Sequence, residues 1–243
     1  MGDKRIYDFK EGEVLLVNKP LNWTSFDVVN KLRYNIKHKL KVKKIKVGHA
    51  GTLDPLADGL LIICTGKKTK TIDELMGLEK SYSGIIRLGS TTPSYDLETE
   101  IDQTFSTEHI TNDLIRATSK NMIGVQDQYP PIFSAKKVEG KKAYDLARKG
   151  HEFELKPKKI EILEFEITNI DGNDVHFIIS CSKGTYIRSI AHDFGKALES
   201  GAHLAALRRE SIGKYGLEHA KTVEDWLDEI NNSELIQHKD LNN

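Results

Sequence analysis

The sequence has little cysteine and no long apolar run, and both features narrow the class of protein. Cys64 and Cys181 are the two cysteines among 243 residues, and both lie in apolar, strand-like segments. We expect buried free thiols, which argue against a structural zinc site or a cysteine nucleophile and fit a cytoplasmic location. No apolar run approaches the roughly 20 residues of a membrane helix. The N-terminus also lacks the apolar core of a signal peptide.

The chain also has no excess of charge of either sign, because 36 lysines and arginines balance 36 aspartates and glutamates. Charged residues make up 30% of the chain and hydrophobic residues 38%, which is typical of a soluble globular protein rather than a disordered one. The length suffices for one substantial domain or two small ones.

The charges are nevertheless unevenly distributed. Between Lys31 and Lys46 the chain has eight lysines and arginines and no acid, and a second basic stretch runs from Lys136 to Lys159. This separation of positive and negative residues indicates a basic face that could contact successive phosphates of a nucleic acid. It therefore argues for a nucleic-acid partner. A solvated lysine-rich surface explains either stretch alone equally well.

The first half of the chain predicts strands and helices in alternation. Residues 13–17 predict a short buried strand that ends in a loop over 18–20. Thr24 and Asp27 form the signature of a helix N-terminus, and apolar residues at helical spacing continue to Leu40. A strand over 60–64 and a helix over 69–76 follow.

The second half predicts a strand over Lys80–Leu88, in which alternate residues share one face. Two further strands are expected over 160–170 and 175–181, joined by a hairpin turn. The expected helices cover 107–122, 141–148, 186–198 and a final segment from Thr222, with Asp225 as its capping partner. Strands and helices are intermixed, so we predict a single α+β domain over residues 1–243, built on a mixed or antiparallel sheet.

The segment Gly48–Gly59, which we call the Asp54 segment, places a carboxylate where neither regular helix nor regular strand is expected. Its glycines allow backbone angles that other residues avoid, and Pro55 disfavours the helical conformation for Asp54. A shaped loop between two strands is a common way to present one side chain to a ligand. The same composition is also typical of an ordinary structural turn.

Several other segments occur in an order and spacing that match a known family. They are Leu16–Pro20, Lys80–Leu88, Pro130–Lys136 and Gly184–Arg188, beside the Asp54 segment. With these segments, the chain resembles the tRNA pseudouridine synthase B (TruB) family from about Gly12 to Tyr215. The resemblance implies a pseudouridine synthase fold, with a central sheet flanked by helices and an RNA-binding cleft. It also implies isomerisation of uridine 55 in the T-loop of tRNA.

The resemblance further assigns roles to individual residues. It makes Asp54 the essential carboxylate, and Arg188 its partner. Tyr82 would stack on the flipped uracil and assist proton removal. His49 would help to hold the T-loop, and Tyr186 belongs to the same motif as Arg188.

The remaining RNA-binding candidates are Lys19, Lys80 and Asp96, of which Lys19 and Lys80 lie in the matching segments. Asp96 aligns with an acidic position near the family's site, and we interpret it as a supporting residue rather than a catalytic one.

This chemistry explains the residue types. The glycosidic C–N bond breaks, the uracil turns, and a C–C bond forms to C5 of the same ring, so no cofactor is required. A carboxylate acts either as nucleophile or as the base that forms a glycal intermediate. Burial alone would raise its pKa, and an adjacent arginine opposes that effect. The nucleotide must also be flipped out of the loop, which costs a few kcal/mol. Stacking of the flipped base on an aromatic side chain offsets about 1–3 kcal/mol of this cost.

The chain departs from many bacterial family members at its C-terminal end. Only 28 residues follow Tyr215 in the chain of 243, below the roughly 40 residues that an unaided domain needs. We therefore expect a closing helix and tail over 217–243 without a PUA domain. The expected partner is the T-arm of tRNA, with no obligate protein partner and a monomeric state.

Three other functions remain as alternatives. The first is an RNA-binding or RNA-folding protein whose turnover is incidental. The second is a synthase of the same fold that acts on another RNA. The third is a hydrolase that uses Asp54, although no second carboxylate is placed convincingly beside it.

Overall fold

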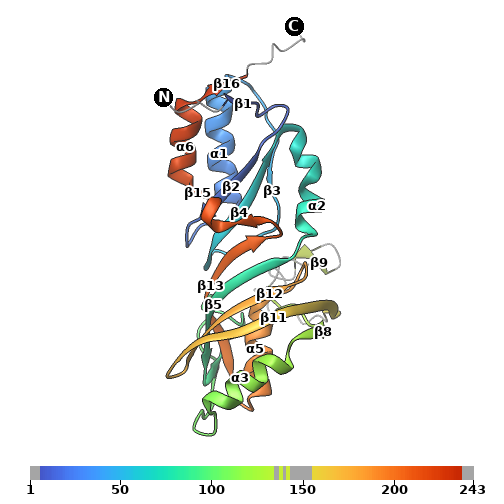
Figure 1. The fold of residues 1–243 in the computed structure, drawn as a ribbon, viewed down its shortest axis with the longest axis vertical. Coiled ribbons are helices and arrows are strands. Elements are labelled where there is room, and N and C mark those ends of the chain that lie inside the picture. The colour runs from blue at the N-terminus through green and yellow to red at the C-terminus, as the bar shows by residue number, and fades with distance from the viewer. Residues whose placement is uncertain (1–5, 134–136, 139–140, 143–154, 237–243) are drawn as a thin grey trace. The chain divides into compact units, whose positions relative to one another are not determined.

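The computed structural model describes residues 6–133, 137–138, 141–142 and 155–236. The chain divides into two compact units, shown with their elements in Figure 1. The first unit combines Met1–Leu78 with Arg208–Asn243, and the second unit is Glu79–Leu207. The expectation of a single domain stays a prediction.

The first unit has a mixed sheet. Its strands are β2 (Val14–Lys19), β3 (Val47–His49), β4 (Ala57–Thr65), β14 (Tyr215–Gly216), β15 (Lys221–Thr222) and the later part of β13 (Ala202–Ile212). β2 and β3 both pair antiparallel with β4, whereas β15 runs parallel to β2. β13 neighbours β4 and pairs with β14. Two short strands, β1 (Ile6–Tyr7) and β16 (Glu234–Leu235), form a separate parallel pair.

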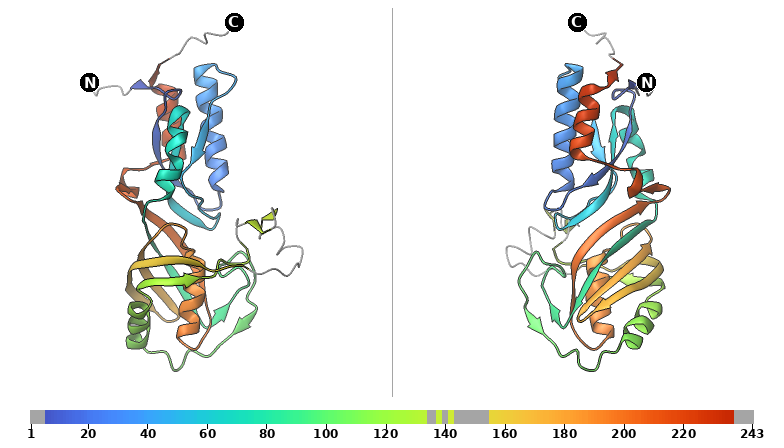
Figure 2. Two further views of the ribbon diagram at one scale, coloured as in Figure 1. Left: turned by 90° about the vertical axis from the view of Figure 1, so that its right-hand side faces the viewer. Right: turned by 60° about the vertical axis from the view of Figure 1, so that its left-hand side comes forward.

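Two helices of the first unit begin at the predicted caps. They are α1 (Ser25–Leu40) and α6 (Val223–Asn232), which lie side by side in Figures 1 and 2. Thr24 and Asp27 form a capping box for α1, and Thr222 and Asp225 form one for α6, so both predictions are confirmed. The predicted helix over 69–76 is also present, as a 3-10 helix η1 (Gly66–Thr71) followed by α2 (Ile72–Met76).

Strand β4 is buried on both faces, which explains its unbroken apolar run. Leu61 and Ile63 belong to the core beneath α1 and α6. Leu60, Ile62 and Cys64 belong to a second cluster with Leu75 of α2. Each such side chain contributes about 1.5–3 kcal/mol by burial, so β4 is a rigid support for the Asp54 segment that precedes it.

The second unit has a sheet in the order β13-β5-β12-β11-β8, in which β5, β12, β11 and β8 pair antiparallel. Its long strands are β5 (Lys80–Leu88), β8 (Gly124–Gln128), β11 (Lys158–Asp171) and β12 (Asp174–Cys181). Its short strands are β6 (Ser90–Thr91), β7 (Gln103–Thr104), β9 (Lys137–Val138) and β10 (Lys141–Lys142). Its helices include α3 (Asn112–Asn121) and α5 (Ile187–Ala197). Phe194 of α5 packs against Phe165 of β11, which meets Phe177 of β12 edge-on.

The observed architecture confirms the α+β class and most predicted elements. The predicted strand Lys80–Leu88 matches β5, and the predicted hairpin is formed by β11 and β12. Cys64 and Cys181 are buried free thiols, as expected. No helix in the described part of the chain is long and apolar enough to cross a membrane.

Some boundaries were wrong. β2 continues through Lys19, which pairs with Gly59 of β4, so the expected loop over 18–20 and the end of the Asp54 segment are partly strand. The helix expected from 107 begins only at Asn112, because the Thr111 side chain accepts a hydrogen bond from the backbone N–H of Leu114 and caps it there. The start of the helix expected over 141–148 is strand β10, which pairs with β9. The rest of that helix lies outside the described residues.

Candidate active site

The backbone on both sides of Asp54 is fixed by the start of α1. The Ser25 hydroxyl donates to the carbonyl oxygen of Leu53 (3.0 Å) and accepts from the Leu53 N–H (2.8 Å). The Asn22 N–H donates to the Pro55 carbonyl at 2.8 Å. Ser25 is buried, whereas Asp54 is partly exposed. The segment therefore presents its carboxylate from a backbone that is held at both neighbours of Asp54.

Arg209 holds the other end of the Asp54 segment within the same unit. Its side chain is fully buried, and its Nε donates to the Leu60 carbonyl (2.7 Å) while Nη2 donates to the Gly51 carbonyl (3.1 Å). Gly59 adopts a φ of +102°, and a Cβ there would lie 2.4 Å from the carbonyl oxygen of Arg209. Glycine is therefore required where β4 passes β13.

His49 and Lys19 are the other predicted site residues of the first unit. Burial lowers the pKa of His49, and the positive charge of Arg209 lowers it further. Lys19 is fully buried, and its ammonium donates to the carbonyls of Pro20 (2.9 Å) and Trp23 (2.6 Å). Burial lowers the pKa of Lys19 to about 8, although the negative charges of Asp58 and then Asp54 oppose that shift.

Asp58 lies near the end of the Asp54 segment, at the start of β4. It receives two hydrogen bonds from Arg208, from Nε at 3.0 Å and from Nη2 at 2.7 Å. Its partner is half exposed, so this contact joins β4 to β13 in the first unit at a solvent-facing position.

Tyr82 and Lys80 lie on strand β5 of the second unit. Tyr82 pairs with Ile179 of β12 and is 8% exposed, and Lys80 pairs with Cys181 and is 7% exposed. Tyr82 is on the inward face of the strand, as the alternation predicted.

Tyr186 is fixed by Gln128 at the end of β8. The Tyr186 N–H donates to the Gln128 side-chain oxygen (2.8 Å), and the Gln128 amide nitrogen donates back to the Tyr186 carbonyl (3.1 Å). Gln128 is buried, and Tyr186 is the N-cap residue of α5. The two hydrogen bonds therefore fix the backbone where α5 begins, two residues before Arg188.

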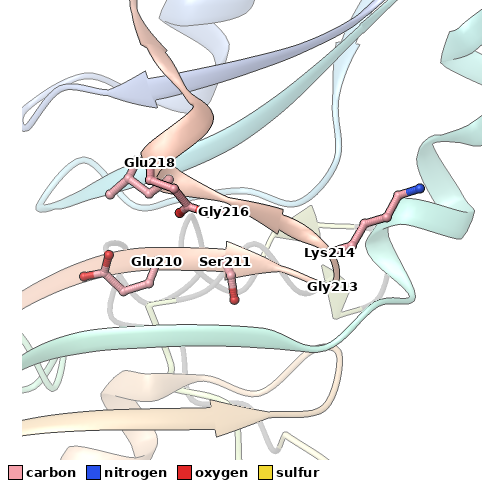
Figure 3. Close-up of a pocket in the computed structure, with 7 residues that line it drawn as sticks. Glu210, Ser211, Gly213, Lys214, Gly216 and Glu218 are labelled. Carbon is pink, nitrogen blue, oxygen red and sulfur yellow. The ribbon is translucent and has the colours of Figure 1, made fainter.

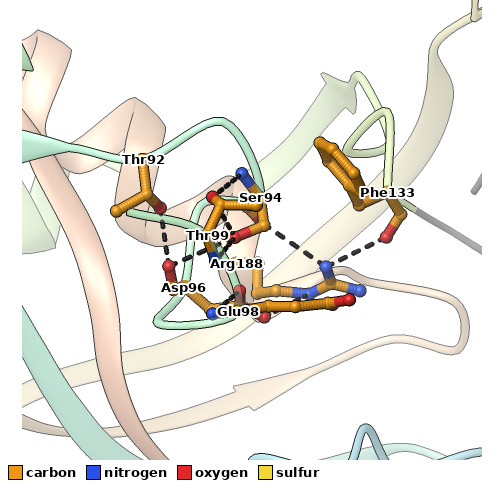
Figure 4. Close-up of polar contacts among 7 residues, drawn as sticks. All are labelled: Thr92, Ser94, Asp96, Glu98, Thr99, Phe133 and Arg188. Carbon is orange, nitrogen blue, oxygen red and sulfur yellow. Dashed lines mark hydrogen bonds and ion pairs between the residues drawn. The ribbon is translucent and has the colours of Figure 1, made fainter. Parts of the chain in front are cut away.

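The Arg188 guanidinium is held by several groups, which Figure 4 shows. Its Nη1 donates to the carbonyls of Phe133 (3.0 Å) and Ser94 (3.4 Å), and its Nε lies 3.5 Å from Oδ2 of Asp96. Both side chains of this ion pair are under a tenth exposed. Asp96 also accepts a hydrogen bond from the Glu98 N–H at 3.0 Å. The structure thus brings together two of the predicted site residues, Asp96 and Arg188.

Residues 92–99, which we call the 92–99 turn, carry these acceptors and are braced by an aromatic stack. Tyr95 adopts a φ of +63°, and its ring stacks on His192 with centroids 3.9 Å apart and planes 12° apart. His192 lies one helical turn after Arg188 on α5, so one helix face carries both the guanidinium and the ring. Burial lowers the pKa of His192 to about 4, and the charge of Lys196 adds to that shift.

The predicted site residues are divided between the units. Lys19, His49 and Asp54 belong to the first unit, and Lys80, Tyr82, Asp96, Tyr186 and Arg188 belong to the second. The pairing of Asp54 with Arg188 stays a prediction. Sequence reasoning missed the supporting roles of Ser25, Gln128 and Arg209, because nothing beside these residues in the sequence identifies their partners.

A separate hollow of about 500 Å³ lies in the first unit between β13 and β14. Figure 3 shows six of the residues that line it, which are Glu210, Ser211, Gly213, Lys214, Gly216 and Glu218. None of the predicted site residues lines this hollow. The described residues also contain no group of three or more histidine, cysteine, aspartate or glutamate side chains arranged to hold a metal ion.

Two solved structures share this fold. A structure of an H/ACA RNP bound to a substrate RNA containing 2′-deoxyuridine aligns with a TM-score of 0.65 and 27% identity over 90% of the chain. A Cbf5-Nop10-Gar1 complex aligns with a TM-score of 0.67 and 26% identity over 94% of the chain. The chain spans only 53% and 59% of those longer chains.

Curated relatives match over almost their whole length. The tRNA pseudouridine synthase B of Phocaeicola vulgatus is 55% identical over 94% of this chain and 99% of the relative. The one of Flavobacterium johnsoniae is 57% identical over 88% of this chain and 93% of the relative. The family model for the N-terminal domain of TruB family pseudouridylate synthases matches residues 37–187, and the model for the tRNA pseudouridylate synthase B C-terminal domain matches 188–241. The chain therefore belongs to the TruB family of pseudouridylate synthases.

Proposed function

We propose that this protein is an isomerase that converts uridine 55 in the T-loop of tRNA to pseudouridine. The observation that carries this proposal is the 55% identity to a curated tRNA pseudouridine synthase B over 94% of the chain and 99% of the relative. The reaction breaks the bond from C1′ to N1 and forms one from C1′ to C5. The C5 proton leaves and N1 gains a proton, so atoms and electrons balance within the substrate and solvent.

In this proposal, Asp54 is the carboxylate that assists cleavage of the glycosidic bond. It acts as nucleophile at the sugar or as the base that forms a glycal. The hydrogen bonds that Ser25 and Asn22 make to the residues beside Asp54 support this role. A reacting group that is positioned before the substrate arrives avoids the entropic cost of being ordered during the reaction.

Arg188 is proposed as the cation that keeps this carboxylate ionised and oriented. A guanidinium matches a carboxylate in geometry and remains charged at all relevant pH values. The carbonyls of Ser94 and Phe133 and the carboxylate of Asp96 fix its plane. Asp96 is itself buried, so we assign it the role of positioning Arg188 rather than touching RNA.

Tyr82 is proposed as the stacking platform for the flipped uracil and as the group that assists removal of the C5 proton. Its position on a central strand of the second unit gives the ring a rigid base. His49 and Tyr186 are proposed to contact the T-loop. Lys19 and Lys80 are both buried, and we propose that Lys19 shapes the loop into α1 and adds positive potential near Asp54.

The proposal also covers the oligomeric state, the cellular location and the part of the tRNA that is recognised. We propose that the protein acts as a monomer, in the cytoplasm, on the T-arm of tRNA. Size measurement by light scattering and activity on an isolated T-arm hairpin test the first and the last of these points.

The experiment that tests the function is incubation with unmodified tRNA and detection of pseudouridine at position 55. Wild-type protein is expected to form product, and Asp54→Asn is expected to lose at least about a hundredfold in rate because the neutral amide can act neither as nucleophile nor as base. Full product with Asp54→Asn, or none with wild type, would overturn the proposal. Mapping pseudouridine in cells without the protein separates tRNA from another RNA target.

A further inference from the structure

Helix α1 has one buried face and one face on which large aromatic side chains are exposed to solvent. Val28, Val29, Leu32, Ile36 and Leu40 are buried in the core of the first unit. On the outer side, Phe26 is 57% exposed and Tyr34 is 69% exposed. Both rings are therefore accessible to a ligand on the side of α1 away from the core.

Basic side chains alternate with these rings along the same face. This face, which we call the basic face of α1, consists of residues at helical spacing, which are Phe26, Asn30, Lys31, Arg33, Tyr34, Lys37, His38 and the C-cap residue Lys41. The Arg33 guanidinium lies 5.8 Å from the centroid of the Phe26 ring, and the rings of Tyr34 and His38 lie 6.4 Å apart with planes 19° apart. The Phe26 ring therefore lies beside a cation, and the Tyr34 ring lies beside an imidazole.

Two open hollows lie along this face, and Tyr34 borders both. One of about 510 Å³ is lined by Asn22, Trp23, Asp27, Asn30, Lys31 and Tyr34. The other, of about 360 Å³, is lined by Tyr34, Lys37, His38, Lys41 and Val42. A planar group that stacks on Tyr34 thus has room and polar neighbours on both sides.

The charge of this region is predominantly positive. Residues 31–46 contain eight lysines and arginines and no acid. Asp27, the acid that lines the first hollow, is engaged by its own helix cap, because its carboxylate accepts hydrogen bonds from the N–H and hydroxyl of Thr24. A ligand with regularly spaced negative charges complements this arrangement, and planar bases complement the exposed rings.

The basic face also begins beside the Asp54 segment, within the same unit. Ser25, the first residue of α1, is bonded to Leu53, and Asn22 is bonded to Pro55. The 16 residues of α1 extend about 24 Å from that point. An RNA strand that leaves Asp54 along this helix would therefore meet the basic face over several nucleotides.

We propose that the basic face of α1 binds the sugar-phosphate backbone of the RNA substrate outside the target loop, with Tyr34 stacking on an unpaired base. This inference rests on the proposed function, because it takes the same tRNA as its ligand. Lys31, Lys37 and Lys41 contact phosphates without reading sequence, and Tyr34 adds a contact to any base.

The test compares two triple variants that remove the same charge. Lys31→Gln/Lys37→Gln/Lys41→Gln removes three cations from the α1 region. Lys120→Gln/Lys196→Gln/Lys214→Gln removes three lysines that are exposed elsewhere. Fluorescence anisotropy with unmodified tRNA gives the Kd of each between 50 and 300 mM salt. Tyr34→Ala and Tyr34→Phe are measured alongside, because an exposed ring can be changed without disturbing the core.

The α1 triple variant is expected to bind tRNA at least about tenfold more weakly, and its slope of log K against log salt is expected to be shallower by about 2–3. The control variant should stay within about twofold of wild type. Tyr34→Ala should weaken binding about tenfold, within the range of one base stack, and Tyr34→Phe should keep it. The KM for tRNA should rise with the Kd.

Equal Kd values and slopes for the two triple variants, together with a neutral Tyr34→Ala, would overturn the inference, and an acidic protein would then be the better ligand for this face. That result leaves the proposed function standing if wild type still modifies uridine 55. Conversely, selective loss of tRNA binding in the α1 variants upholds the inference even if wild type leaves uridine 55 unmodified.

Discussion

The Asp54 segment and the 92–99 turn surround their charged residues differently. The backbone of Leu53 and Pro55, on either side of Asp54, is hydrogen-bonded to Ser25 and Asn22, and Asp54 is a partly exposed residue. Arg188 is buried, and its guanidinium itself is bonded to two carbonyls and a carboxylate. The difference suits the proposed roles, because the group that reacts must remain accessible while the group that orients it must not move.

The largest effect is expected at the buried ion pair of the second unit. Arg188→Met removes the cation and leaves the Asp96 carboxylate buried without it, which should destabilise the protein by about 3–5 kcal/mol and lower kcat at least about a hundredfold. Urea unfolding and single-turnover kinetics measure the two effects.

Arg188→Lys tests the geometry rather than the charge. A lysine keeps the charge but lacks the planar fork of donors, so we expect most of the kcat loss with less loss of stability. Wild-type kcat in Arg188→Lys would show that charge alone is needed and that the bonds to Ser94 and Phe133 are incidental.

A smaller effect is expected where the Asp54 segment meets α1. Ser25→Ala removes both hydrogen bonds to Leu53 and should cost about 1–3 kcal/mol of stability. We expect kcat to fall about tenfold, because the backbone beside Asp54 loses its anchor, while the Kd for tRNA stays nearly constant. The control is Ser119→Ala, another buried serine, whose hydroxyl bonds to Arg116 within α3. A similar kcat loss in both variants would indicate general destabilisation.

The stack that braces the 92–99 turn should contribute less. Tyr95→Ala removes the ring that packs on His192, a contact worth about 0.5–1.5 kcal/mol beyond its buried area. We expect kcat to fall about threefold to tenfold, because the Ser94 carbonyl and the Asp96 carboxylate would hold Arg188 less rigidly. Tyr95→Phe should retain both the stack and the rate. Equal rates for Tyr95→Ala and wild type would show that the hydrogen bonds of the turn suffice without the ring.

The smallest effect is a pH dependence of stability in the second unit. The folded-state pKa of His192 is about 4, below the unfolded value of about 6.5, so the unfolded chain binds more protons between these values. The contribution of His192 is therefore fully present above about pH 6.5 and is lost as the pH falls toward 4.

His192→Phe keeps a ring for Tyr95 and removes the titration. Urea midpoints measured at pH 5 and pH 7.5 should differ less in this variant than in wild type. His49 titrates in the same direction in the first unit, so some dependence should remain in the variant. An unchanged difference would show that the unfolding of wild type takes up no proton at His192.

The two regions also differ in how far the sequence alone predicts them. Capping residues such as Thr24 and Asp27 act within three positions, and the alternation over Lys80–Leu88 is a property of one strand, so both predictions are confirmed. The ends of the Asp54 segment were misjudged because its glycines were interpreted as loop residues. Gly59 instead pairs with Lys19 and passes close to the Arg209 backbone.

The supporting residues could not be predicted because their partners are distant in the chain. Gln128 is 58 positions from Tyr186, and Arg209 is 158 positions from Gly51. A glutamine after a short strand and an arginine pair in an apolar segment have no local pattern that identifies their partners. The interaction of Asp96 with Arg188 is of the same kind, and the resemblance marked both positions without giving their geometry.

The sequence by itself determined the α+β class, the capping boxes that start α1 and α6, the buried strands and the order of motifs that places the chain in its family. These features depend on short-range periodicity and capping, which neighbouring residues set. Only the tertiary structure decided that Ser25 holds the backbone beside Asp54 and that the 92–99 turn holds the Arg188 guanidinium. It also decided that Gln128 fixes the backbone of Tyr186 and that Arg209 holds the carbonyl of Gly51. Burial and hydrogen bonding between distant segments create these properties, because a side chain acquires its environment only when the chain has folded around it.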